Sequence, residues 1–188
     1  YSSSDPWPSR SALPRTAALF FRRVVSGELR AARPIRYSLF ATRSLIYPAM
    51  THPAAFTEIA ENLSFLDDWE DRYRYIIELG QALPPLAESE KNAENKVHGC
   101  TSQVWLVSNH DGAHLEYRGE SDAMIVRGLV AVLVALYSGR PAREIAETDA
   151  IAIFDELGLR EHLTTQRSNG LVAMVNRMRS EARALAAA

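Results

Sequence analysis

The spacing of hydrophobic residues predicts two consecutive helices from Pro53 onward. Proline suits the opening turn of a helix, so we expect the first helix to begin there. Asp67 or Asp68 is expected to cap the second, because acidic residues fill its first turn, where the helix dipole favours them. We expect this second helix to end at Gly80 or at Pro84-Pro85. The apolar faces comprise Phe56, Ile59, Ala60 and Leu63 in the first helix and Trp69, Tyr73, Ile76 and Ile77 in the second.

The middle of the chain changes to the shorter period that is typical of strands. We expect three short strands, at Lys96-Val97, Gln103–Val107 and His114–Tyr117. The segment Asn109–Gly112 ends in Asp-Gly, a pair that favours tight hairpin turns, and it separates the second strand from the third. We therefore expect these two strands to pair as a hairpin.

Helices return in the last third of the chain. Ser121-Asp122 is expected to cap a helix over Ala123–Tyr137, which is apolar on nearly every side and is therefore predicted to be buried. Shorter helices are expected at Pro141–Glu147 and Ala150–Leu157, and a long one from about Ser168 to Ala187. This order of elements predicts an α+β domain in which several helices pack against a small antiparallel sheet of about three strands.

The first quarter of the chain has a different composition. Residues 1–49 are rich in Ser, Arg and Pro and show no clear period. This composition fits a mitochondrial or plastid transit peptide. It also fits translated upstream sequence, because Met50 has the position of a natural start just before the first predicted helix. We expect an N-terminal extension over 1–49 that is disordered or weakly helical, and a folded domain over 50–188.

Charge is distributed unevenly along the chain. Of its 21 basic and 23 acidic residues, eight arginines but only Asp5 and Glu28 lie within residues 1–50. Residues 51–188 therefore carry 13 basic and 21 acidic residues, a net charge of −8. An acidic domain repels phosphate backbones, so we expect no nucleic-acid binding and a partner with a basic surface. The charge-free apolar stretch Gly128–Gly139 is shorter than the roughly 20 residues that a membrane span needs, so we expect no membrane segment.

Cys100 is the only cysteine, which excludes an internal disulfide, a dithiol redox cycle and a cysteine-rich zinc site. Gly99 before it permits a sharp turn, so we expect the thiol in a loop at the edge of the sheet. A positively charged neighbour lowers the pKa of a thiol. Lys96 and His98 are therefore expected to raise the thiolate fraction of Cys100.

The residue types alone leave several interpretations open. A lone cysteine is commonly a small buried hydrophobic residue. His98, His110 and His114 also admit a Cys–His hydrolase dyad, although such enzymes usually take the base from a distant part of the chain. One cysteine with scattered histidines does not match the spacing of a structural zinc site, so we expect no bound metal. A single thiol is sufficient for persulfide chemistry, in which a thiolate attacks the outer sulfur of a donor persulfide.

The run Val97–Leu106, VHGCTSQVWL, resembles the active-site segment of the SufE/CsdE family, whose pattern is V-x-G-C-x-S-x-V-W followed by a hydrophobic residue. Further stretches resemble that family in the same order, at Trp69–Gly80, at Ser121–Leu129 with Leu136–Gly139, and at Arg167–Leu171 with Met174. The resemblance extends over most of the predicted domain. Several collinear motifs are a far more specific signal than a Gly-Cys pair alone.

The resemblance implies an α+β fold shared with IscU-type cluster scaffolds and a role in iron–sulfur cluster assembly. It implies that Cys100 accepts persulfide sulfur from a PLP-dependent cysteine desulfurase of the SufS or CsdA type and stimulates that enzyme. The sulfur would then pass to a SufBCD-type scaffold or to another acceptor. The PLP belongs to the desulfurase, and we expect this chain to bind no cofactor. It would act as a sulfurtransferase-like carrier rather than as a stand-alone enzyme.

We expect His98, Gly99, Thr101 and Ser102 to form the loop that supports the thiol. Arg127, a charged residue within the apolar helix, is expected to be a structural member of an ion pair. Two alternative functions remain: a module that regulates the desulfurase without carrying sulfur, and a Cys–His thiol hydrolase. We expect a bacterial carrier of this kind in the cytoplasm, whereas a transit peptide would direct it to a mitochondrion or plastid.

Overall fold

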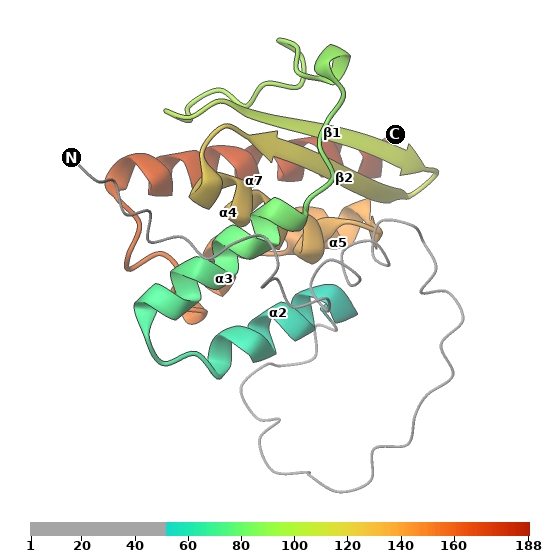
Figure 1. Ribbon diagram of the computed structural model, residues 1–188. Coiled ribbons are helices and arrows are strands. Elements are labelled where there is room, and N and C mark those ends of the chain that lie inside the picture. Colours follow the sequence, from blue (N-terminus) through green and yellow to red (C-terminus); the bar gives the residue numbers. More distant parts are fainter. Residues whose placement is uncertain (1–51) are drawn as a thin grey trace, which may run out of the picture. The chain divides into compact units, whose positions relative to one another are not determined.

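An antiparallel hairpin forms most of the sheet in the computed structural model, which describes residues 52–188 (Figure 1). In this hairpin β1 (Val104–Asp111) pairs with β2 (His114–Ser121) along their full lengths. The chain reverses at Gly112, whose φ of 71° favours glycine. The short strand β3 (Arg140–Pro141) pairs with the start of β2 and completes a sheet in the order β1-β2-β3. The expected α+β class and the expected hairpin are confirmed.

The third strand differs from the one that the sequence predicts. Lys96-Val97 is not a strand, because Lys96 forms one isolated bridge to Trp105 and the chain then turns away at Gly99, where φ is 92°. Its place as third strand is taken by β3, which is too short to show a hydrophobic period. The extension expected over residues 1–49 and the domain start at Met50 lie outside the described residues.

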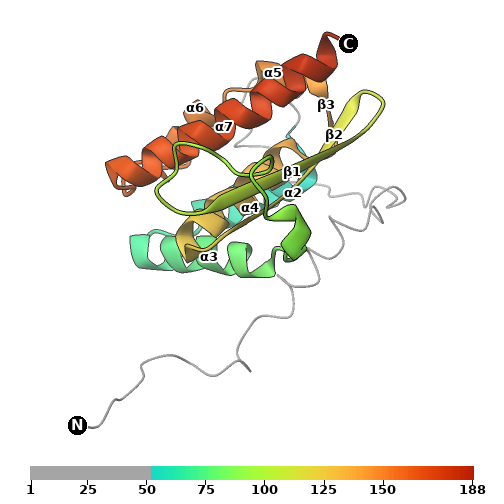
Figure 2. The same ribbon diagram turned by 90° about the horizontal axis from the view of Figure 1, so that it is seen from above.

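The helix α4 (Met124–Tyr137) is the buried centre of the domain. From Gly128 to its end every residue is buried, as the apolar pattern predicts. It packs against β2, α2 (Ala54–Ser64), α3 (Trp69–Ala82) and α7 (Thr165–Ala186). Figure 2 shows α7 and α3 on either side of the hairpin. Because α4 contacts so many other elements, the positions of its residues are fixed from several directions.

The helices α3 and α4 cross closely because each presents a glycine to the other. A Cβ atom added to Gly128 would lie 2.3 Å from the carbonyl oxygen of Ile76, and one added to Gly80 would lie 2.6 Å from the Gly128 nitrogen. Real Cβ atoms do not approach other atoms so closely, so no larger residue fits at either position without a shift. Of the two ends that the sequence predicts for α3, Gly80 is wrong because it lies within the helix at the crossing, whereas the helix does end at Ala82, just before Pro84-Pro85.

The helix starts show which caps the sequence predicts correctly. Asp68 caps α3 by accepting a hydrogen bond from the first turn of its backbone, as expected. At α4 the expected cap is wrong, because Ala123 is the N-cap residue and its side chain cannot accept a hydrogen bond. Ser121 Oγ accepts a hydrogen bond from Ala123 N, which precedes the first turn of the helix. α7 begins earlier than expected, because Thr164 caps it by accepting a hydrogen bond from Arg167 N.

The remaining elements complete the packing around α7. The short helices α5 (Ala142–Glu147) and α6 (Ala150–Glu156) lie close to their expected positions, and a further short turn, η3 (Glu88–Glu90), precedes the sheet. α5 packs against α7, and the buried hydroxyl of Tyr117 donates to the Met178 carbonyl at 2.9 Å, which ties β2 to α7. None of the helices within residues 52–188 combines the length and hydrophobicity that a bilayer crossing requires.

Candidate functional site

Cys100 lies on a loop whose two ends are held by hydrogen bonds of the backbone and of the Asp122 side chain. At the base, Val97 N donates to Val104 O at 2.8 Å. On the outgoing side, Gln103 N donates to Asp122 Oδ1 at 3.0 Å, and Asp122 N donates back to Gln103 O at 3.3 Å. The residues between these ties are mostly exposed, and the positive φ of Gly99 provides the bend before the thiol. The fold therefore presents the cysteine on a short loop with fixed ends, as predicted.

The sulfur of Cys100 rests against a glycine inside α7. The half-buried thiol donates a hydrogen bond to the carbonyl oxygen of Gly170, with 3.4 Å between sulfur and oxygen. A Cβ atom added to Gly170 would lie 3.2 Å from the sulfur, closer than a comfortable contact. Glycine within a helix costs about 1 kcal/mol relative to alanine. The sulfur needs the space that a larger side chain would fill, which explains why a glycine stands at this position of the helix.

A pocket of about 280 Å³ opens beside the sulfur. It lies where the Cys100 loop meets the first turns of α4 and of α7. Its lining residues are Cys100, Thr101, Ser102, Val126, Thr164, Gln166, Arg167 and Gly170. Most of these side chains are polar, so the pocket suits a small polar or anionic group next to the thiol.

Arg167 is the charged residue of this lining. Within residues 52–188 its guanidinium makes no hydrogen bond or ion pair, although its backbone nitrogen donates to the Thr164 hydroxyl at 3.4 Å. A guanidinium without a protein partner beside a pocket is available to an anion. The anion that the site itself can generate is the thiolate of Cys100.

The environment of Cys100 favours the protonated thiol. Burial raises the pKa of Cys100 above its ordinary value, because a half-buried thiolate loses part of its hydration. The expectation that Lys96 and His98 lower this pKa is wrong, because desolvation dominates and the His98 side chain is exposed to solvent. The thiolate fraction of Cys100 in the isolated chain is therefore smaller than that of an ordinary cysteine at neutral pH.

The family model for SufE, described as an Fe-S metabolism associated domain, matches residues 57–182, a range that includes the loop and the pocket. The chain belongs to the SufE family. This membership associates it with iron–sulfur metabolism.

Two bacterial relatives of the SufE family cover most of the described residues. An uncharacterized SufE-like protein of Rhizobium etli is 57% identical over 139 residues, which are 72% of this chain and 94% of the relative. An uncharacterized SufE-like protein of Rhizobium meliloti is 54% identical over 129 residues, which are 66% of this chain and 92% of the relative. Both matches extend the resemblance far beyond the cysteine motif.

A solved structure shares the fold. It is the solution structure of a hypothetical protein from Thermus thermophilus, with a TM-score of 0.60 and 20% sequence identity. The match covers 73% of this chain and 100% of that chain. The likeness supports the α+β architecture of this SufE family member.

The expected loop residues take different places around the SufE family cysteine. Thr101 and Ser102 line the pocket, whereas the exposed residues His98 and Gly99 do not. Within residues 52–188 no histidine hydrogen-bonds to Cys100, and the same part of the chain holds no group of three His, Cys, Asp or Glu side chains placed to bind a metal. The described geometry therefore offers no support for a Cys–His dyad.

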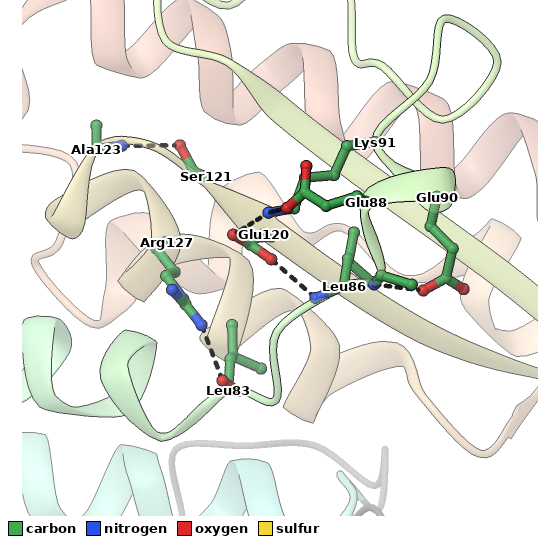
Figure 3. Close-up of polar contacts among 10 residues, drawn as sticks. Leu83, Leu86, Glu88, Glu90, Lys91, Glu120, Ser121, Ala123 and Arg127 are labelled. Carbon is green, nitrogen blue, oxygen red and sulfur yellow. Dashed lines mark hydrogen bonds and ion pairs between the residues drawn. The ribbon is translucent and has the colours of Figure 1, made fainter.

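Arg127 lies outside the pocket and contacts the connection that follows α3. Its Nη2 donates to the Leu83 carbonyl at 2.9 Å, and within the described residues it forms no ion pair (Figure 3). Beside it Glu120 accepts a hydrogen bond from Leu86 N at 2.8 Å and pairs with Lys91 Nζ at 3.0 Å. Burial alone would raise the pKa of Glu120, but these two contacts, together with the positive charge of Arg127, outweigh it and lower the pKa. The direct contact of Arg127 is therefore with a carbonyl, and in place of the expected ion pair its charge acts on Glu120 from beyond contact distance.

Sequence reasoning did not assign roles to Gly170, Arg167 and Val126, which the fold brings to the thiol. One signal was present in the sequence, since a glycine inside a helical pattern is costly and usually has a packing reason. The contact itself joins residues 70 positions apart in the chain. It becomes visible only when α7 and the Cys100 loop are placed side by side.

Proposed function

We propose that this chain accepts sulfane sulfur from a PLP-dependent cysteine desulfurase onto Cys100 and passes it on for iron–sulfur cluster assembly. The thiol of Cys100 first releases its proton, and the thiolate attacks the outer sulfur of a persulfide on the desulfurase. The bond between the two sulfurs of the donor breaks, the inner sulfur leaves as a thiolate, and a new persulfide remains on Cys100. The desulfurase supplies the sulfur and holds the PLP.

One observation carries this proposal: the half-exposed sulfur of Cys100 adjoins a pocket that is lined by hydroxyls and by Arg167, whose guanidinium has no partner among residues 52–188. A persulfide is one sulfur atom longer than a thiol and ionises more readily. The pocket offers room for the added atom, and the Arg167 guanidinium offers a charge opposite to that of the persulfide anion. Membership of the SufE family supports the same chemistry.

The raised pKa of Cys100 gives the partner a role in the reaction. A thiol that is mostly protonated reacts slowly with small molecules in solution, because the thiolate is the nucleophile. A desulfurase surface that brings positive charge to the loop would raise the thiolate fraction only in the complex. The acidic net charge of residues 51–188 favours such a basic surface.

Incubation of the chain with a cysteine desulfurase, PLP and cysteine, followed by intact mass measurement, tests the proposal. The wild-type chain should gain the mass of one or more sulfur atoms, and the gain should disappear on treatment with a reducing thiol. Cys100→Ser should gain none. His98→Ala, which alters an exposed loop residue outside the pocket lining but keeps the thiol, controls for general disturbance of the loop and should retain most of the loading.

The alternatives predict different results in the same experiment. A regulatory module that carries no sulfur would stimulate the desulfurase equally well as Cys100→Ser and as wild type. A thiol hydrolase would turn over an activated ester without any desulfurase present. If the wild-type chain gains no sulfur under conditions in which the desulfurase turns over, the carrier proposal is wrong.

A further inference from the structure

Three residues on one face of α7 contact the Cys100 loop. Gly170 accepts the hydrogen bond of the thiol. Ala173 lies against Gly99, since a Cβ atom added to that glycine would be 3.5 Å from the Ala173 Cβ. Arg177 Nη1 donates to the carbonyl oxygen of Lys96 at 3.1 Å. Positions separated by three and four residues lie on the same side of a helix, so this face of α7 forms a continuous seat for the loop.

Arg177 fastens the incoming end of the loop to this seat. Lys96 forms the isolated bridge that closes the loop, so a contact to its carbonyl acts directly at the base. Among residues 52–188, Arg177 provides the sole side-chain hydrogen bond from α7 to this loop. The contact from Gly170 uses its backbone carbonyl, and the contact from Ala173 is apolar. The hydrogen bond from Arg177 is thus the polar contact between α7 and the loop that a side-chain substitution can remove without altering the helix backbone.

A carboxylate holds the guanidinium in place for this contact. Glu181, one turn further along α7, accepts a hydrogen bond from Arg177 Nε at 2.9 Å. The two side chains are only 27% and 26% exposed, so solvent screens the pair less than it would a surface ion pair. The second carboxylate oxygen of Glu181 is buried without a hydrogen-bond partner in the described residues. Removal of Arg177 alone would therefore leave a poorly compensated acidic group.

We propose that Arg177 is a positioning residue for Cys100, which holds the Lys96 carbonyl on α7 and thereby keeps the sulfur half-buried against Gly170. Release of this contact frees the base of the loop, so that the sulfur leaves its carbonyl acceptor more often and becomes more accessible. The effect on sulfur exposure is independent of any partner. Its importance for sulfur transfer rests on the proposed function, because a persulfide that leaves its seat is exposed to reducing agents before delivery.

Alkylation of Cys100 by iodoacetamide measures the exposure directly in the full chain. Arg177→Ala should be alkylated about tenfold faster than wild type, which corresponds to the loss of one hydrogen bond to a charged group. Arg177→Lys keeps a charged donor at this position and should restore most of the protection. A persulfide loaded on Cys100 should also be lost to a reducing thiol several-fold faster in Arg177→Ala.

Arg179→Ala is the matched control. Arg179 lies on the same helix and also donates to a backbone carbonyl, that of Ala146, which belongs to α5 and not to the loop. Its substitution removes a similar contact and should leave the alkylation rate within about twofold of wild type, as for an effect that does not reach the loop. The free energies of unfolding of all variants are measured in urea, so that alkylation through global unfolding can be separated from local opening.

The double variant Arg177→Met with Glu181→Gln removes the contact without leaving a buried carboxylate, and it takes the place of Arg177→Ala if that variant does not fold. Equal alkylation rates for the Arg177 and Arg179 variants, or rates that follow global unfolding, would overturn the proposal. Failure of the proposed function, sulfur transfer, can be distinguished from failure of this proposal on Arg177. In that case the wild-type chain would gain no sulfur from a desulfurase, while the alkylation difference would persist.

Discussion

The surroundings of Cys100 favour a neutral thiol in the resting chain. The loop and α7 remove part of the hydration of the sulfur, and the acceptor beside it in the described part of the chain, the Gly170 carbonyl, favours the protonated thiol. A thiolate would have to give up this contact, because a carbonyl oxygen repels negative charge. The same seat leaves a pocket open on one side, so the sulfur remains reachable by a reagent that enters beside Arg167.

The raised pKa of Cys100 predicts a pH dependence of stability. Above the ordinary thiol pKa, about 8.5, the unfolded chain releases the thiol proton before the folded chain does. The free energy of unfolding should therefore fall as the pH rises from about 8 through the raised folded value. Burial also raises the pKa of Tyr137 to about 12, and buried Tyr117 shifts in the same direction, so tyrosines affect stability at still higher pH.

Urea unfolding of wild type and Cys100→Ser between pH 7 and about 10 isolates the contribution of the thiol, since both variants share the tyrosines. The difference in unfolding free energy between the two should be constant near neutral pH and should shift against the wild type as the pH rises. A difference that does not change over this range would contradict the raised pKa.

Gly170→Ala separates the stability of α7 from the fit of the sulfur. Alanine favours a helix over glycine by about 1 kcal/mol, so the free energy of unfolding should be equal to or slightly above that of wild type. The new Cβ atom, 3.2 Å from the sulfur, should displace the thiol. A small misplacement of a reacting atom can cost one or two orders of magnitude in rate, so sulfur loading should slow by about tenfold.

Asn176→Ala is the control for this substitution. Asn176 is exposed on the same helix, so alanine there raises helix propensity without touching Cys100. Loading rates of both variants are measured by mass after incubation with the desulfurase. Normal loading in Gly170→Ala would show that the sulfur does not need this space.

At the scale of elements, the crossing of α3 and α4 fixes the core on which the site is built. Gly80 and Gly128 let the two backbones approach to distances that exclude a Cβ atom. α4 also contributes Val126 to the pocket, only two residues before Gly128. A shift of α4 along this crossing would therefore move one wall of the pocket together with the core.

Gly128→Ala should strain this crossing, because its Cβ atom would lie 2.3 Å from the Ile76 carbonyl oxygen and backbone yields less easily than a side chain. Overpacking of this kind costs about 3 kcal/mol at the upper end of its usual range. Gln81→Ala, at an exposed position of α3, should change stability by less than about 0.5 kcal/mol and serves as the control. Urea unfolding measures both; a loss below about 1 kcal/mol in Gly128→Ala would show that the crossing can relax.

Elements with a clear period could be predicted from the sequence, whereas features that depend on tertiary contacts could not. The Asp-Gly turn determines the hairpin locally, and the uninterrupted apolar run of α4 marks it as buried. β3 has only two residues, which are too few to show the hydrophobic period from which a strand is predicted. The early start of α7 follows from the cap at Thr164, which precedes polar residues without an apolar pattern.

The same distinction applies to the site. Cys100 could be identified because it is the only thiol and follows a glycine in a recognisable motif. Its pKa could not be predicted, because neighbours in sequence suggested positive charge, whereas burial against α7 dominates. Gly170, Arg167 and Arg177 reach the loop from about 70 to 80 residues further along the chain, a proximity that no local pattern encodes.

At the scale of the whole molecule, the described helices and strands pack around one hydrophobic core. They begin with α2 at Ala54 and end with α7 at Ala186. The family model matches residues 57–182, within these limits. The matched parts of the two Rhizobium relatives amount to 94% and 92% of their lengths, so almost the whole of each relative is matched by this chain. Every residue that the proposals use lies within it.

A chain of residues 50–188 should therefore retain both the fold and the proposed chemistry. Its urea unfolding midpoint should agree with that of the full chain, because this shorter chain keeps every core residue and every tie of the Cys100 loop described above. Its sulfur loading by a desulfurase and its iodoacetamide reactivity at Cys100 should also be unchanged. A lower midpoint would show that residues before Met50 contribute to the stability of the domain. An unchanged midpoint with slower loading would place their contribution at the desulfurase instead, since the loop itself would then be intact.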